Sequence, residues 1–129
     1  GNAYENMANR SEVIFKPHCS PDELKILIPS AVAMVYVSLF EGFGIPIIEA
    51  MKCGTPVITS NVSSMPEIAA DAALLTDPYS ISSISNAMQA ITSNNRLRDD
   101  MVEKGLKRAE DFSWDETASK LWESIEKTI

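Results

Sequence analysis

Apolar runs that are typical of β-strands alternate along the chain with patterns that are typical of α-helices. The strand-like runs occupy residues 13–15, 31–37, 56–59 and 73–75. The helical patterns occupy residues 21–29, 46–51, 80–92, 95–110 and 115–128, with a further helical turn at 64–67. Strands that alternate with helices through short loops predict an α/β fold, in which a doubly wound parallel sheet of about four strands carries helices on both faces. The last three helices follow one another without a strand, so the C-terminus is expected to be helical.

The run at residues 31–37 is expected to be the central strand of this sheet. It is rich in valine and has no polar alternation, which is typical of a strand covered on both faces. The helix boundaries also carry recognisable signals. Ser20 and Glu23 can form a capping box around Pro21 at the start of one helix, and Gly54 follows the helix at 46–51 as a stop signal.

Composition and charge narrow the classes of function. With 129 residues, of which 45% are apolar, the chain can form one globular domain with a buried core. It has 18 acidic and 11 basic residues and a net charge of −7, and its Lys and Arg residues form no continuous run. This excludes a nucleic-acid-binding surface. A site for a small anion stays compatible with the charge, because backbone N–H groups and helix ends bind phosphate even in acidic proteins.

Cysteine and histidine usage gives a further expectation. Cys19, Cys53 and the single His18 lack the spacing of metal ligands, so no metal site is predicted and a reducing, cytoplasmic compartment is favoured. The sequence has no apolar run of 18 residues or more and no signal-peptide pattern. It begins at Gly1 rather than at Met, which suggests a piece of a longer protein.

The candidate site follows the central strand. In parallel α/β sheets, ligands bind at the carboxyl ends of the strands. There the segment 38–44 must turn sharply, and Gly42 and Gly44 are expected to supply positive φ angles and close approach to a ligand. The next helix begins near Pro46, so its N-terminal N–H groups suit a phosphate.

Two glutamates flank this glycine turn, and they require a different partner from phosphate. Glu41 and Glu49 would repel an anion, whereas carboxylates accept hydrogen bonds from sugar hydroxyls. A nucleotide sugar has hydroxyls on both sides of a diphosphate and fits such a site. Taken alone, the two glycines favour an ordinary turn over a ligand site, and each glutamate taken alone favours a solvated or capping carboxylate. Thr59 and Ser60 are weaker candidates for the phosphate side, and residues 63–64 are expected to cap a helix.

The same segment resembles a known family. The motifs are EGFGIPIIEAM at 41–51, CGTPVI at 53–58, Pro66-Glu67 and Asp71-Ala72-Ala73. They closely resemble the C-terminal half of the group-one glycosyltransferases of family four, which are retaining enzymes with two Rossmann-like domains in the GT-B arrangement. The resemblance runs from about Val13 to Ile129. It implies that residues 1–129 form a single partial, Rossmann-like, donor-binding domain.

The resemblance also implies roles for individual residues. Glu41, the candidate catalytic residue, would contact hydroxyls of the transferred sugar, and Glu49 would contact the ribose. The turn formed by Gly42, Phe43, Gly44 and Ile45 would hold the sugar and diphosphate through its main chain. Lys16 and Pro17, after the first predicted strand, would lie beside the base. A UDP- or GDP-hexose would be the donor, and no metal or other cofactor is implied.

Departures from the family pattern lead to three further expectations. Val37 stands where the family usually has a proline. The first two strands of the family's donor domain, with the Arg and Lys that neutralise the diphosphate, are missing from this chain, as is the acceptor-binding N-terminal domain. The sheet should therefore be incomplete, and the chain alone should lack transferase activity. An exposed strand edge should either rearrange or be covered by a second copy.

Two classes of function follow from these observations. The first is a hexosyltransferase of polysaccharide biosynthesis that acts on a glycan or a lipid-linked acceptor, in the cytoplasm or peripherally at the inner face of the membrane. The alternative is a non-catalytic module that binds or senses a nucleotide sugar. An upstream Rossmann-like half with a catalytic acidic residue or histidine would favour the first.

Overall fold

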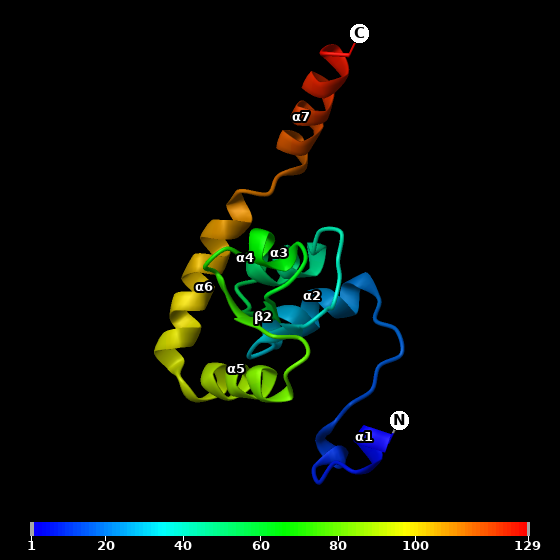
Figure 1. Ribbon diagram of the computed structural model, residues 1–129, viewed down its shortest axis with the longest axis vertical. Helices are drawn as coiled ribbons and strands as arrows, with labels where there is room; N and C mark the ends of the chain where they lie inside the picture. The colour runs from blue at the N-terminus through cyan, green and yellow to red at the C-terminus, as the bar shows by residue number, and fades with distance from the viewer. Residues whose placement is uncertain (1, 129) are drawn as a thin grey trace.

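The structure is a computed structural model that describes residues 2–128 (Figure 1). The N-terminal part contains α1 (Asn2–Glu5), a 3₁₀ turn at Arg10–Glu12 and α2 (Pro21–Ser30). The central part contains, in order, β1 (Met34–Tyr36), α3 (Ile45–Lys52), β2 (Val57–Ser60), α4 (Met65–Ala69) and β3 (Ala73–Thr76). The C-terminal part consists of α5 (Ile81–Ser93), α6 (Asn95–Glu110) and α7 (Trp114–Glu126). The helices therefore form close to where the sequence predicts them.

The sheet has three parallel strands in the order β1-β2-β3. Met34 pairs with Val57 at one end, and Ser60 pairs with Thr76 at the other. Each pair of parallel neighbours needs a crossover connection, which α3 and α4 provide. The parallel α/β class is confirmed, but the sheet has three strands within residues 2–128 rather than about four.

The strand expected at residues 13–15 does not form. This segment has no regular structure; Ile14 is 86% exposed and Phe15 is 68% exposed. Phe15 makes an edge-to-face contact with Tyr4 at 4.7 Å between ring centroids. A strand is stabilised by its hydrogen-bonded neighbours, and within residues 2–128 no strand of the sheet pairs with this segment. The expectation of a central strand at 31–37 is wrong. The run shortens to β1, which lies at the edge of the sheet with Val35 44% exposed, and the fully buried β2 is the central strand.

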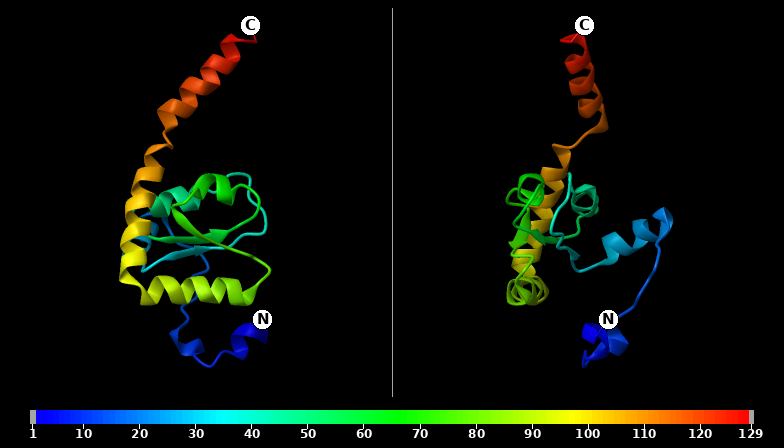
Figure 2. Two further views of the ribbon diagram at one scale, coloured as in Figure 1. Left: turned by 60° about the vertical axis from the view of Figure 1, so that its left-hand side comes forward. Right: turned by 45° about the vertical axis from the view of Figure 1, so that its right-hand side comes forward.

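Helices cover both faces of the sheet (Figure 2). On one face α3 and α4 build a core that includes Ile47, Met51 and Met65. On the other face α5 and α6 pack Ile91 and Met101 against Ile58. The doubly wound arrangement is therefore confirmed, with α6 running along the side of the sheet (Figure 2).

A glycine lets α6 approach α3 closely. A Cβ atom added to Gly105 would lie 3.3 Å from Met51 Cγ and 3.7 Å from Met51 Cα. Because Met51 is 1% exposed and lies on α3, this contact ties α6 to the helix that follows the candidate loop.

Two segments extend from this central body. Helix α7 projects beyond it at one end, and the N-terminal segment stands away from the sheet (Figures 1 and 2). Only the end of α2 reaches the body, where Ile28 packs against the core and its carbonyl accepts from the Thr55 hydroxyl. Neither α2 nor α7 contains a buried residue. None of the helices within residues 2–128 is long and apolar enough to cross a membrane. The outer edge of β1 carries no partner strand in the same range, so association through this edge stays a prediction.

The two methionines Met51 and Met88 provide a matched test of the core. Met51 is buried on α3, whereas Met88 on α5 is 46% exposed. We expect Met51→Ala to lower the free energy of unfolding by about 2–5 kcal/mol, because it leaves a cavity in the core. Met88→Ala should change it by less than about 0.5 kcal/mol, as surface substitutions usually do. Urea denaturation monitored by circular dichroism measures both, and equal effects would contradict the observed packing.

Candidate functional site

The loop between β1 and α3, residues 37–44, lies at the carboxyl end of the sheet and is held by side-chain hydroxyls. Thr59 Oγ1 donates to the Tyr36 carbonyl at 2.8 Å, and Ser60 Oγ donates to the Ser38 carbonyl at 2.5 Å. Both hydroxyl residues are fully buried at the end of β2. The expectation that Thr59 and Ser60 face a phosphate is therefore wrong, because their hydroxyls are directed to the main chain of the neighbouring strand.

The segment after β2 braces the turn of the loop. Ser63 Oγ accepts a hydrogen bond from Glu41 N at 3.2 Å and donates to Glu41 O at 2.9 Å. Ser64 Oγ lies 3.0 Å from Glu41 O and 2.7 Å from Phe43 O, and its single proton can serve either carbonyl. Ser64 is the N-cap of α4 by position, yet its side chain makes no capping bond. The two serines thus fix the main chain on both sides of Gly42.

The two glycines of the turn behave differently. Gly44 has φ +117° and is the N-cap of α3, and an added Cβ would lie 3.2 Å from Ile47 Cδ1. Gly42 does not have a positive φ, and an added Cβ would meet no atom within 4 Å. The expectation of a left-handed conformation is thus correct for Gly44 and wrong for Gly42. The N–H groups of Gly44 and Ile45 make no hydrogen bond to any described residue, so they are free to bind an anion.

Glu41 is half-buried and is held through one oxygen. Its Oε1 accepts a hydrogen bond from the Tyr36 hydroxyl at 2.6 Å and another from Ser38 Oγ at 2.8 Å. The Tyr36 hydrogen bond, followed by that of Ser38, lowers the pKa of the Glu41 carboxyl. The same hydrogen bond to Glu41, with a smaller contribution from burial, raises the pKa of Tyr36. Glu41 is therefore an anion with Tyr36 as its donor.

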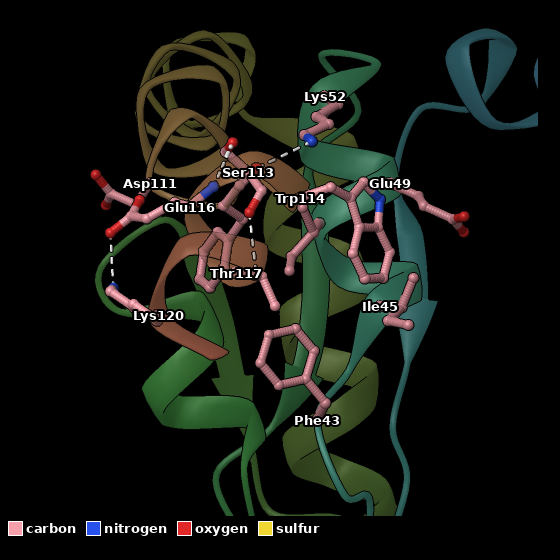
Figure 3. A pocket seen from close by; sticks show the side chains of 12 residues that line it. Phe43, Ile45, Glu49, Lys52, Asp111, Ser113, Trp114, Glu116, Thr117 and Lys120 are labelled. Carbon is pink, nitrogen blue, oxygen red and sulfur yellow. Dashed lines mark hydrogen bonds and ion pairs between the residues drawn. The ribbon is translucent and has the colours of Figure 1, made fainter. Parts of the chain in front are cut away.

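Glu49 lies on α3, beside a cavity of about 580 Å³. Phe43, Ile45 and Glu49 are among the residues of the loop and α3 that line one side (Figure 3). Glu49 is exposed, and its carboxylate points outward from the helix (Figure 3). Glu41 and Glu49 thus follow the same strand but face different surroundings.

The opposite wall of this cavity comes from the junction between α6 and α7. It contains Trp114 and Phe112, and the ring of Phe43 meets that of Phe112 edge to face at 6.0 Å. Phe112 also lies 4.7 Å beneath the Arg108 guanidinium, which donates to the Glu67 and Ile68 carbonyls at the end of α4. The aromatic contact therefore connects the candidate loop to the C-terminal helices.

The structure does not bring Lys16 and Pro17 to this loop. They lie on the irregular segment that precedes α2, which stands away from the sheet (Figure 2). Lys16 forms an ion pair with Glu23 instead. The predicted placement beside a base depended on a strand at 13–15, and that strand is absent. The exposed Lys52 donates to the Phe112 carbonyl at 3.2 Å and points away from the loop as well.

Sequence reasoning missed the residues that hold the loop. Tyr36 was read only as part of an apolar strand, and Ser38 only as the start of a turn. The available signal was the concentration of hydroxyl residues around the two strand ends, with Tyr36 and Ser38 at the end of β1 and TSNVSS at 59–64 across the end of β2.

A glycine-bearing loop at the carboxyl end of a parallel sheet lies where α/β proteins of this class bind their ligands. Comparison with known sequences identifies the family. The sequence model described as "Glycosyl transferases group 1" matches residues 2–108. The chain belongs to this family, and the resemblance carried by the EGFG segment is confirmed.

Individual relatives support the same assignment. The chain is 44% identical over 96 residues to O-antigen chain mannosyltransferase B of Escherichia coli, an alignment covering 74% of this chain and 25% of the relative. It is 32% identical over 114 residues to the MMP alpha-(1->4)-mannosyltransferase of Mycolicibacterium hassiacum, covering 85% and 28% respectively. The chain thus spans about a quarter of the length of these relatives.

A solved structure supports the fold. The sucrose-phosphate synthase of Thermosynechococcus elongatus superimposes with a TM-score of 0.78 at 27% identity, over 96% of this chain and 32% of that one. The parallel sheet, its helices and the helical C-terminus are therefore shared with part of this longer synthase.

The two glycines offer a matched test of the loop geometry. Alanine at position 44 must adopt a positive φ and crowd Ile47, so we expect Gly44→Ala to lower the free energy of unfolding by about 1–2 kcal/mol. Gly42→Ala should leave it nearly unchanged, because φ is ordinary and the added methyl group meets no neighbour. Chemical denaturation of both variants measures the difference. A larger loss in Gly42→Ala than in Gly44→Ala would contradict the structure.

Proposed function

We propose that this chain is the donor-binding part of a retaining glycosyltransferase that transfers a hexose from a nucleotide sugar to a glycan or a lipid-linked acceptor. The observation that carries the proposal is the loop 41–45, where free N–H groups at Gly44 and Ile45 lie next to the ionised Glu41. Family membership supports glycosyl transfer, and the length of the relatives supports a larger protein around this domain.

The loop offers complementary groups for the two ends of a sugar diphosphate. The N–H groups at the start of α3, with the positive end of the helix dipole, suit the diphosphate. Glu41 suits hydroxyls of the transferred sugar, and the exposed Glu49 suits the ribose. In the transfer, the bond between the anomeric carbon and the phosphate oxygen breaks, the nucleoside diphosphate leaves, and the acceptor hydroxyl passes its proton to that phosphate oxygen as it bonds to the sugar. Negative charge then builds up on the phosphate, which N–H groups in fixed positions stabilise.

The sugar is proposed from the relatives. Both curated relatives described above are named as mannosyltransferases, one of them for the O-antigen chain. Mannose is therefore the first hexose to test, in a polysaccharide pathway of the cytoplasm or at the inner face of the membrane. The titration described below distinguishes a UDP-linked donor from a GDP-linked donor.

The same geometry leads us to propose that residues 1–129 lack transferase activity alone. A bound diphosphate needs cationic partners. Lys16 is paired with Glu23, and Lys52 is directed to the Phe112 carbonyl. We propose that the neutralising Arg and Lys, and the acceptor site, belong to other parts of the full-length protein.

Calorimetric titration of the full-length protein with UDP, GDP and their hexose conjugates tests the proposal. We expect either the uridine or the guanosine nucleotides to bind. Glu49→Ala should raise the Kd of both the free nucleotide and its sugar conjugate by roughly tenfold, because a charge-assisted hydrogen bond to the ribose is lost. Glu103→Ala, an exposed glutamate on α6, is the matched control and should bind as the wild type does. Absence of nucleotide binding, or equal loss in both variants, would refute the donor site.

A further inference from the structure

We propose that Tyr36 and Ser38 are positioning residues that hold Oε1 of Glu41, so that Oε2 faces the hydroxyls of the transferred sugar. This inference rests on the proposed function, because it assigns the sugar-binding atom within that site. Neither Tyr36 nor Ser38 contacts the sugar in this proposal, and both act through Glu41.

The hydrogen-bond pattern distinguishes the two carboxylate oxygens. Tyr36 and Ser38 both donate to Oε1, at 2.6 and 2.8 Å. A carboxylate oxygen has about two acceptor positions, so Oε1 is fully occupied. Oε2 accepts no hydrogen bond from any described residue, although the side chain is half-buried. The contact with the sugar therefore falls to a single oxygen rather than to both.

The two donors stand on a rigid part of the fold. Tyr36 is the last residue of β1, paired with Thr59 of β2, and its carbonyl accepts from the Thr59 hydroxyl at 2.8 Å. Its ring packs against the core beneath α3. The carbonyl of Ser38 is held by Ser60 at 2.5 Å. Groups that are held by the sheet fix a carboxylate more accurately than a flexible loop could.

The hydroxyl groups of Tyr36 and Ser38 also favour the ionised form of Glu41. Hydrogen bonds to the ionised form lower the pKa of this carboxyl, so it stays an acceptor when the pH falls into the range where an ordinary glutamate gains a proton. Among the described residues, no other charged side chain takes part in this contact: Glu49 projects outward on α3, and Lys52 binds the Phe112 carbonyl. The low pKa of this carboxyl therefore depends on the two hydroxyl donors.

The test compares a nucleotide sugar with its free nucleotide in the full-length protein. In Tyr36→Phe, which keeps the ring but removes the donor, we expect the Kd of the nucleotide sugar to rise about fivefold to tenfold. The Kd of the free nucleoside diphosphate should not change, because Glu41 does not contact the nucleotide. Ser38→Ala should act in the same direction. Tyr79→Phe is the matched control, since the side chain of Tyr79 is 77% exposed.

An NMR titration of the Glu41 side-chain carboxyl gives a second readout. Its pKa should rise towards the ordinary glutamate value in Tyr36→Phe and stay low in Tyr79→Phe. If Tyr36 had a purely structural role, Tyr36→Phe would raise the Kd of the free nucleotide and that of the nucleotide sugar by the same factor. That result would overturn the proposal. Unchanged nucleotide-sugar binding in both Tyr36→Phe and Ser38→Ala would overturn it as well, with the proposed function intact. If the wild type binds no nucleotide sugar, the proposed function fails and this inference fails with it.

Discussion

The arrangement of the loop between β1 and α3 depends on hydrogen bonds from side-chain hydroxyls to main-chain carbonyls. The parallel ladder between β1 and β2 ends at Tyr36 and Thr59, and beyond this point the carbonyls of the loop no longer find partners in a strand. Main-chain carbonyls that lose access to water need a hydrogen-bond partner, and those of Ser38 and Glu41 are partly buried. Ser60, Ser63 and Ser64 supply the missing donors. Side-chain hydroxyls at and after the end of β2 therefore replace the main-chain hydrogen bonds of the ladder.

The need to bind these carbonyls explains why the residues that stabilise the fold next to the loop also shape the candidate site. The left-handed Gly44 places the start of α3 directly beneath the loop, and Ile47 and Met51 bury that helix against the sheet. The loop is consequently fixed at both ends, by hydroxyls on one side and by a packed helix on the other. A ligand that binds such a loop meets N–H groups and a carboxylate whose positions are already set, which reduces the ordering that binding requires.

The sequence predicted those parts of the fold that depend on local signals. The capping box of Ser20 and Glu23 and the helix at 95–110 appear as expected, because caps and helical periodicity act within one element. The strand at 13–15 does not form, because a strand depends on neighbours that are distant in sequence and that local signals do not reveal. The candidate loop was found from its glycines and glutamates, yet the conformational difference between Gly42 and Gly44 depends on the exact path of the chain. Tyr36 was missed, because its hydroxyl reaches Glu41 only after the loop has turned back on the strand.

Tyr36 and Ser38 bind only one oxygen of Glu41, and this has a consequence for a glutamine at the same position. A glutamine at this position would have one acceptor oxygen, and the Tyr36 and Ser38 hydroxyls would draw that oxygen towards themselves. The NH₂ group would then occupy the place of Oε2 and present donors where the carboxylate presents lone pairs. The amide would thus reverse the hydrogen-bond polarity at the open position rather than merely remove a charge, and a ligand hydroxyl there would have to act as an acceptor.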